Sequence, residues 1–143
     1  MSIGGRGMRP PTSQSSSTAS QHVLIADDDP VVRHLLRRVL TKEFNCTVDE
    51  AADGAEALRA IASTSYCLVF LDLRMPLVDG LQALGYIRSR PETSKVPVIV
   101  LSASCADDVV RHAVQMGVAD FLMKPLSPSV AERLKRVLSR DAA

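Results

Sequence analysis

The stretch CLVFLDLRMPLVDGL, residues 67–81, decides the fold. Its first five residues are all apolar, and a run without alternation is typical of a strand buried on both faces, as in a parallel sheet covered by helices. The run ends at Asp72, and Asp79-Gly80 then opens a segment in which apolar residues recur at helical spacing. The stretch therefore predicts a buried strand, a loop that begins with an acidic residue, and a helix.

The same alternation continues in both directions along the chain. Four further apolar runs are present, VLIA (23–26), CTVDEA (46–51), VPVIVL (96–101) and ADFLM (119–123). The segments that follow the runs carry apolar residues at i, i+3 and i+4, which indicates amphipathic helices. Five strands alternating with five helices predict an α/β fold of the (βα)5 type.

Turn and capping residues agree with these boundaries. An aspartate or serine followed by Pro or Gly predicts a helix start, and a glycine predicts a helix end. The signals are Asp29-Pro30, Asp53-Gly54, Asp79-Gly80 and Ser127-Pro128 for helix starts, and Gly117 for the end of the fourth helix. Residues 1–21 are rich in Gly, Pro, Ser and Thr, so we predict a disordered tail over 1–21 and one domain over 22–141.

Composition excludes several function classes. The formal charge of +1 lacks the basic excess of a direct nucleic-acid binder. The apolar runs are far shorter than the roughly 20 residues of a membrane-spanning helix, and no secretory signal is present at the N-terminus. The three cysteines, Cys46, Cys67 and Cys105, show no C-x-x-C spacing, which argues against disulfides or zinc and favours buried thiols in a reducing cytoplasm.

Polar residues follow the apolar runs at the positions where an α/β sheet binds ligands. Asp27, Asp28 and Asp29 follow the first run, Asp72 the third, Ser102 the fourth and Lys124 the fifth. The carboxyl ends of parallel strands meet at one edge of the sheet, so these side chains are expected to converge. Each residue alone has an ordinary explanation as a cap or turn residue, and Asp29 is expected to be a helix N-cap.

Clustered carboxylates need a compensating charge. Several carboxylates a few ångströms apart repel one another, and Lys124 offers one positive charge. Oxygen ligands without His or Cys suit Mg2+. A metal with open positions, an ammonium and a hydroxyl together suit a phosphoryl group, and Asp72 is the natural nucleophile.

The order and spacing of these residues resemble the receiver domain of two-component response regulators, the CheY-like family. The resemblance rests on VLIADDDPVVR (23–33), LVFLDLRMPLVDGL (68–81), VPVIVLSA (96–103) and VADFLMKPL (118–126), and it covers about residues 22–140. It implies a flavodoxin-like, doubly wound sheet of five parallel strands in the order 2-1-3-4-5.

The resemblance also implies a role for each site residue. Asp72 would be the phosphoacceptor and a Mg2+ ligand, with Asp28 as a direct ligand and Asp27 acting partly through water. Arg74 would lend its backbone carbonyl to the metal. Ser102 and Lys124 would contact the phosphoryl group, a cis bond would join Lys124 and Pro125, and Ser102 and Phe121 would form the switch. Ser102 and Phe121 stand where Thr and Tyr are commoner, so the switch would rely on burial of the ring.

The implied function is stoichiometric phosphoryl transfer to Asp72 from a sensor histidine kinase or phosphotransfer domain in the cytoplasm. The modified domain would dock on an unidentified downstream protein through its fourth helix, fifth strand and fifth helix. It would act as a monomer or as a phosphorylation-dependent dimer, without direct contact to nucleic acid or membrane. The chain leaves no room for an output domain after the fifth helix, so we expect a stand-alone receiver or a piece of a longer protein.

Three alternatives belong to other classes. A phosphatase of the haloacid-dehalogenase type would need a D-x-D pair, and the chain has Asp72-Leu73-Arg74. A receiver-like interaction module that works without phosphorylation would usually lack an acidic residue or the lysine. A flavin-binding domain would need a loop that holds phosphate, and the Asp27–Asp29 run would repel one.

Overall fold

The fold is built on one parallel sheet in this computed structural model, which describes residues 21–103 and 108–142. The five strands are hydrogen-bonded in the order β3-β2-β4-β5-β6, and all four pairings are parallel. Their bounds are β2 His22–Ala26, β3 Thr47–Ala51, β4 Leu68–Asp72, β5 Val98–Ser102 and β6 Asp120–Met123. The predicted strand order is confirmed.

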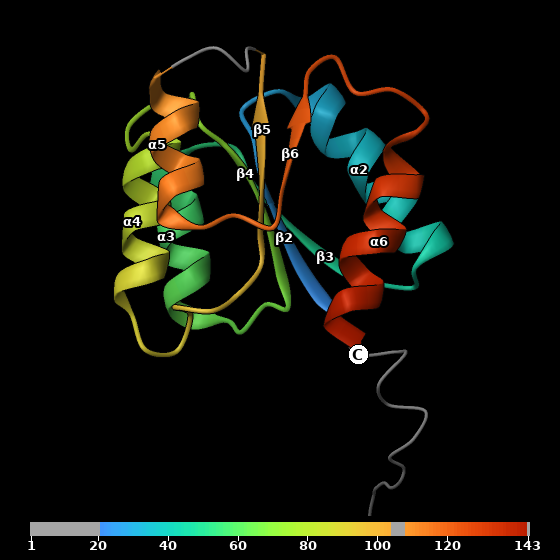
Figure 1. Cartoon of the computed structure of the whole chain (residues 1–143), viewed down its shortest axis with the longest axis horizontal. Helices are drawn as coiled ribbons and strands as arrows, with labels where there is room; N and C mark the ends of the chain where they lie inside the picture. Colours follow the sequence, from blue (N-terminus) through green and yellow to red (C-terminus); the bar gives the residue numbers. More distant parts are fainter. Residues whose placement is uncertain (1–20, 104–107, 143) are drawn as a thin grey trace, which may run out of the picture.

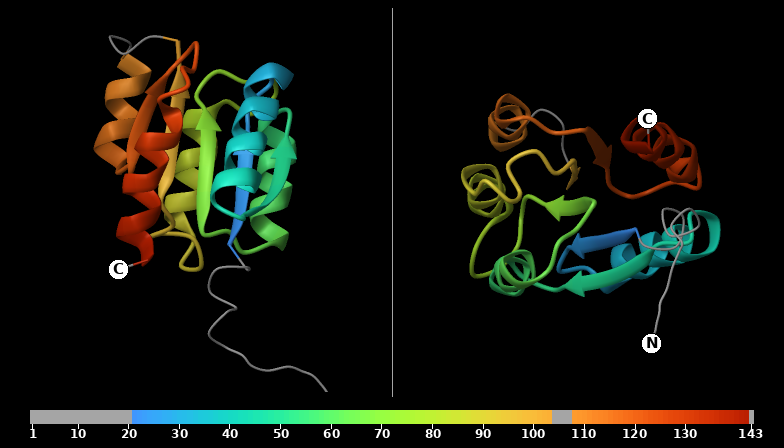
Figure 2. Two further views of the ribbon diagram at one scale, coloured as in Figure 1. Left: turned by 90° about the vertical axis from the view of Figure 1, so that its right-hand side faces the viewer. Right: turned by 90° about the horizontal axis from the view of Figure 1, so that it is seen from below.

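A helix follows each strand, so the predicted (βα)5 alternation is confirmed as well. The helices are α2 Pro30–Glu43, α3 Gly54–Ser63, α4 Gly80–Ser89, α5 Asp108–Met116 and α6 Val130–Ala142. Helices α2 and α6 cover one face of the sheet, and α3, α4 and α5 cover the other (Figure 1). The view from below in Figure 2 shows the same three layers, with the sheet between the two helical layers.

The core consists of two aliphatic clusters, one on each face of the sheet. Alternate residues of β2 divide between them, with Val23 and Ile25 on the α2 and α6 side and Leu24 on the other. All five residues of β4 are buried, which agrees with its uninterrupted apolar run and its central place. The strand that ends at Asp72 is therefore shielded on both faces.

Most of the predicted helix boundaries are confirmed. The side chains of Asp29, Asp53 and Asp79 each accept a hydrogen bond from a backbone N–H in the first turn of their helix. Gly117, with φ +96°, follows the end of α5. Asp79 also shares a reciprocal capping box with Gln82.

The predicted start of the last helix at Pro128 is wrong. Helix α6 begins at Val130, because residues 127–129 form a turn that precedes it. In this turn the Val130 N–H donates to the Ser127 carbonyl, and the Ser127 and Ser129 hydroxyls share a hydrogen bond of 2.6 Å. The Ser127 hydroxyl is thus bonded within the turn instead of serving as the predicted helix cap.

The β4–α4 loop, residues 73–79, is pressed between the starts of two helices. A Cβ atom added to Gly54 would lie 1.7 Å from the Val78 carbonyl oxygen. A Cβ atom on Gly80 would lie 2.1 Å from the carbonyl oxygen of Asp72 itself. Glycine is required at both positions because backbone approaches backbone there.

Two predictions concern residues that the structure does not describe. The predicted tail, apart from Gln21, and Cys105 lie outside the described residues. Within residues 21–103 and 108–142, no helix has the length and apolar character needed to cross a bilayer.

Candidate functional site

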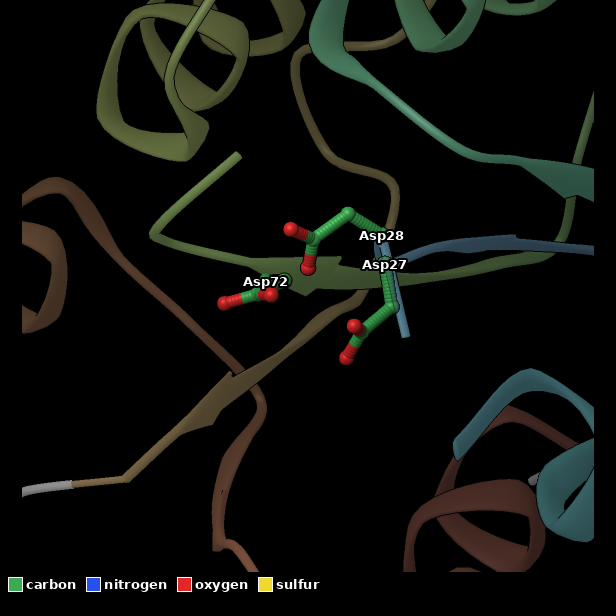
Figure 3. A group of neighbouring side chains, drawn as sticks. All are labelled: Asp27, Asp28 and Asp72. Carbon is green, nitrogen blue, oxygen red and sulfur yellow. The ribbon is translucent and has the colours of Figure 1, made fainter. Parts of the chain in front are cut away.

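The predicted site residues lie at the carboxyl edge of the sheet. Asp27 directly follows β2, Asp72 ends β4, Ser102 ends β5 and Lys124 directly follows β6. Asp27, Asp72 and Ser102 are among the few buried polar residues, whereas Asp28 is exposed. Figure 3 shows Asp27 and Asp28 at the end of β2 and Asp72 at the end of β4. The parallel topology thus gathers residues that are far apart in the sequence.

Lys124 joins two of the acids. Its Nζ atom donates to Asp27 Oδ2 at 3.0 Å and to Asp72 Oδ2 at 3.1 Å. Its backbone N–H donates to the Ser102 carbonyl at 2.8 Å, which ties β6 to β5 at the same edge. The predicted cis bond between Lys124 and Pro125 is confirmed. The ammonium is therefore held between the two buried carboxylates.

The remaining carboxylate oxygens are partly satisfied by backbone donors. Asp27 Oδ1 accepts from the Asp29 N–H at 2.8 Å, and Asp72 Oδ1 accepts from the Arg74 N–H at 3.0 Å. One ligand oxygen from each of Asp27, Asp28 and Asp72 lies within 4.8 Å of the others. Lys124 offsets one of these three negative charges, so the all-oxygen cluster has the charge and the donor chemistry to hold a hard divalent cation.

Burial dominates the acid–base behaviour of the central carboxyl. It raises the pKa of Asp72 to about 6, and the neighbouring Asp27 charge acts in the same direction, while the Arg74 N–H and Lys124 oppose the change. For Lys124, burial would lower the pKa, but the bonds and charges of Asp27 and Asp72 outweigh it and raise the pKa. Lys124 therefore stays charged beside Asp72, a carboxyl group that is costly to ionise.

An open hollow of ≈ 440 Å³ lies beside Asp28. It is lined by Asp28 and by residues of the β4–α4 loop and the two neighbouring helices, among them Arg74, Met75, Asp79, Leu81 and Val109. Arg74 is exposed, so its side chain lies at the mouth of the site. The hollow therefore lies next to Asp28, the exposed member of the acid cluster.

Ser102 and Phe121 lie around the cluster. Ser102 is 4 % exposed and comes one residue after Leu101, the β5 partner of Asp72. Phe121 pairs with Val100 in the sheet, and its half-buried ring packs against the apolar cluster on the α3, α4 and α5 side. The structure thus brings together Asp27, Asp28, Asp72 and Lys124, with Ser102 on the adjacent strand and Phe121 further from the acids.

The sequence reasoning missed one side chain at this edge, that of Arg33. Its Nη1 atom donates to the backbone carbonyl of Asp27 at 2.6 Å. The spacing of Arg33 from the acidic run gives a weak signal, since it lies one helical turn into α2. A helical pattern does not show which carbonyl a long side chain reaches.

Cys46 and Cys67 agree with the prediction of buried or half-buried thiols. Cys46 is a buried thiol and Cys67 a half-buried one, and neither is part of a disulfide within the described residues. Burial raises the pKa of the Cys46 thiol to about 11, so it stays protonated near neutral pH.

The sequence profile of the response regulator receiver domain matches residues 23–136. The fold and the acid-rich edge define a receiver domain, and the chain belongs to the response regulator receiver family.

Curated relatives and solved structures agree with this assignment. The chain is 36% identical over 124 residues to the transcriptional regulatory protein ResD of Bacillus subtilis, covering 86% of this chain and 50% of ResD. It resembles the receiver domain of a Pseudomonas aeruginosa sensor histidine kinase, solved with magnesium in its active-site cleft. That match has 29% identity and a TM-score of 0.75, and it covers 87% of this chain and 100% of that one.

A chemotaxis response regulator, CheY4 of Vibrio cholerae, shares the fold. Its TM-score is 0.75 at 24% identity, and the match covers 82% of this chain and 98% of that one. The curated relatives are longer than the matched region, since this chain spans half of ResD and 22% of the transcription factor SKN7 of Candida albicans. The shared part is the receiver domain.

Proposed function

We propose that this domain is the phosphoacceptor of a two-component or phosphorelay system and that Asp72 takes the phosphoryl group from a phosphohistidine. The observation that carries the proposal is the setting of Asp72. It is 3 % exposed, it lies 3.1 Å from the Lys124 ammonium, and it shares a cluster with the exposed Asp28. A carboxylate that lies between an ammonium and a candidate metal site is well placed to attack phosphorus.

Three residues would have separate roles in phosphoryl transfer. Asp72 forms the new O–P bond as the bond between phosphorus and the imidazole nitrogen breaks. Lys124, already charged and bonded to Asp72, would move its hydrogen bond to a phosphoryl oxygen. Ser102 would supply a hydroxyl from the adjacent strand. Domains of this kind are modified stoichiometrically, so we expect one phosphoryl group per chain instead of turnover.

The acid cluster suits Mg2+. Asp28 and Asp72 would be its carboxylate ligands, the Arg74 backbone carbonyl would be a further ligand, and Asp27 would act partly through water. When bound, the ion would neutralise charge on the phosphoryl oxygens. The magnesium described for the related Pseudomonas receiver domain supports this part of the proposal.

The output surface we propose consists of α5, β6 and α6. Modification of Asp72 would add roughly −1.5 to −2 charge, draw in Ser102 and let the Phe121 ring bury further. Val114 of α5 and Met123 of β6 are 54% and 46% exposed, so this face offers apolar contacts. Its partner would be a downstream protein or a second copy of the domain, in the cytoplasm, with the kinase or phosphotransfer domain as donor.

Intact-mass measurement tests the proposal directly. Incubation with acetyl phosphate and Mg2+ should add about 80 Da to the wild-type protein and nothing to Asp72→Asn. Chelation of the metal should stop the labelling. As a matched control, Asp49→Asn removes a carboxylate on β3, away from the site, and should label normally. Wild-type protein that never gains this mass, or that turns over a generic phosphoester catalytically, contradicts the proposal.

A further inference from the structure

Arg33 on α2 bonds the backbone of the acidic run. Its Nη1 atom lies 2.6 Å from the carbonyl oxygen of Asp27, and its side chain is 17% exposed. The N–H of Asp27 donates to the Ala51 carbonyl at 3.1 Å, at the end of β3. Asp27 is thus held by its N–H on one side and by its carbonyl on the other.

The carbonyl of Asp27 belongs to the same peptide unit as the N–H of Asp28. Because this unit is planar, a bond that fixes the carbonyl also fixes where the Asp28 backbone leaves the strand. Asp28 is exposed, so its carboxylate gains little orientation from packing. Its position therefore depends strongly on the backbone that Arg33 holds.

Arg33 is itself held by Glu50, the residue before the end of β3. Arg33 Nε donates to Glu50 Oε1 at 2.8 Å, and Arg37 Nε donates to Glu50 Oε2 at 2.5 Å. With the guanidinium engaged by Glu50 and the Asp27 carbonyl, its positive charge is kept on the backbone side of the acids. A loose guanidinium would instead compete with a metal ion for the carboxylates.

We propose that Arg33 is a positioning residue for the divalent-cation site, acting through the Asp27–Asp28 peptide and fixed in turn by Glu50. This inference rests on the proposed function, because it concerns the metal ion that the acid cluster would hold. It assigns Arg33 no contact with the ion or with the phosphoryl group.

Arg37 provides a matched control. It lies on the same helix and bonds the same Glu50, but its other guanidinium contact is the Val48 carbonyl at 3.2 Å, away from the acids. Arg33→Gln and Arg37→Gln remove the same charge and break the same kind of ion pair. Only Arg33→Gln releases the Asp27 carbonyl.

The test is a Mg2+ titration of isotope-labelled protein followed by NMR, without phosphate donor. We expect Arg33→Gln to weaken Mg2+ binding about tenfold, the low end of what losing a group that orients a metal ligand costs. Arg37→Gln should stay within about twofold, because it holds no metal ligand. Arg33→Lys, which keeps the charge but cannot reach both partners with a planar fork, should fall in between.

The sign of the change separates positioning from simple electrostatics. Removing a nearby positive charge by itself would tighten Mg2+ binding, so unchanged or tighter binding by Arg33→Gln overturns the inference. Saturating Mg2+ should restore the initial rate of acetyl phosphate labelling of Arg33→Gln, and persistent slow labelling also overturns it. Wild-type protein that binds no Mg2+ contradicts the proposed function, whereas a normal wild type with an equally normal Arg33→Gln contradicts only this inference.

Discussion

The sheet has one polar cluster at its carboxyl edge and another toward its amino edge. Each contains aspartate side chains, but the neighbours of these carboxylates differ. At the carboxyl edge, Asp27 and Asp72 share the Lys124 ammonium. Toward the amino ends of β2 and β4, Asp49 accepts a hydrogen bond of 2.7 Å from the Tyr66 hydroxyl and lies 3.0 Å from His22 Nε2. The His22 and Tyr66 rings meet edge to face, with centroids 4.9 Å apart.

The pKa of the acid moves in opposite directions in the two clusters. The Tyr66 hydrogen bond is the main cause that lowers the pKa of Asp49, and it outweighs partial burial. Burial is the main cause that raises the pKa of Asp72 to about 6, and it outweighs Lys124. An ionised carboxylate whose hydrogen-bond partners stabilise its charge contributes to the stability of the fold. A carboxylate that is costly to ionise because it is buried is stabilised when a cation binds beside it.

The largest expected effect comes from removing the one ammonium of the carboxyl-edge cluster. Lys124→Met should lower the free energy of unfolding by about 4 kcal/mol at pH 7.5 without Mg2+, because two buried carboxylates lose their partner. Urea unfolding measures the change. Lys135→Met, which replaces an exposed lysine of α6, is the control, and an equal effect of the two substitutions would show that the two carboxylates are not costly to bury.

Neutralising Asp72, the proposed acceptor, should change the free energy of unfolding in the opposite direction. The folded state raises the pKa of Asp72 from 3.8 to about 6, so it binds the proton more tightly than the unfolded chain does. This contribution to stability is present below about pH 4 and is lost as the pH rises through about 6, about 3 kcal/mol in all. Without Mg2+, Asp72→Asn should therefore be more stable than the wild type at pH 7.5, and the difference should vanish near pH 4.

Asp49→Asn provides the contrast within that experiment. It should be less stable than the wild type at neutral pH, because its carboxylate is the acceptor of a satisfied network. If Asp49→Asn and Asp72→Asn change the free energy of unfolding in the same direction, the distinction between the two clusters is wrong.

A smaller effect on the free energy of unfolding is expected in the cluster toward the amino edge of the sheet. Tyr66→Phe should lower the free energy of unfolding by about 1 kcal/mol at pH 7, the usual worth of one hydrogen bond. Because the folded state lowers the pKa of Asp49 below 3.8, the loss should be full above that pH and should shrink as the pH falls further. Mg2+ affinity and phosphate labelling should not change, and an altered labelling rate would mean that the two ends are coupled.

The smallest effect concerns Arg74, at the mouth of the site. Its guanidinium is hypothesised to approach the phosphoryl group on Asp72 and to stabilise charge during hydrolysis. Arg74→Ala should slow the loss of phosphate by about threefold, as expected for one exposed charge. The rate is measured by intact mass after the donor is removed, with the exposed Arg38→Ala on α2 as control. An unchanged rate disproves the hypothesis.

The order of strands and the placement of the acids could be predicted from the sequence, because both follow from local pattern and from parallel topology. Uninterrupted apolar runs such as residues 67–71 identify buried strands, and each polar residue that follows such a run must lie at one edge. The helix caps at Asp29, Asp53 and Asp79 could also be predicted, because their hydrogen bonds span only two or three residues.

The contacts of long side chains and the geometry of turns could not be predicted from the pattern of apolar and polar residues. The contact of Arg33 with the Asp27 carbonyl depends on the rotamer of a flexible side chain and on Glu50 from another strand. The Lys124 ammonium makes two hydrogen bonds, one to Asp27 and one to Asp72, and both depend on how closely β2 and β4 approach each other. Ser127 paired with Ser129, a local competition that the Ser-Pro signal for a helix start does not reveal.

The contact between Gly80 and the end of β4 ties the start of α4 to the backbone of Asp72. The Gly80 N–H donates to the Leu73 carbonyl, and its α-carbon leaves no space for even a methyl group against the Asp72 backbone. A shift of the strand tip would therefore act directly on the first turn of α4. If Asp72 is modified as proposed, this contact would give the change a path to α4 that does not depend on the Phe121 ring.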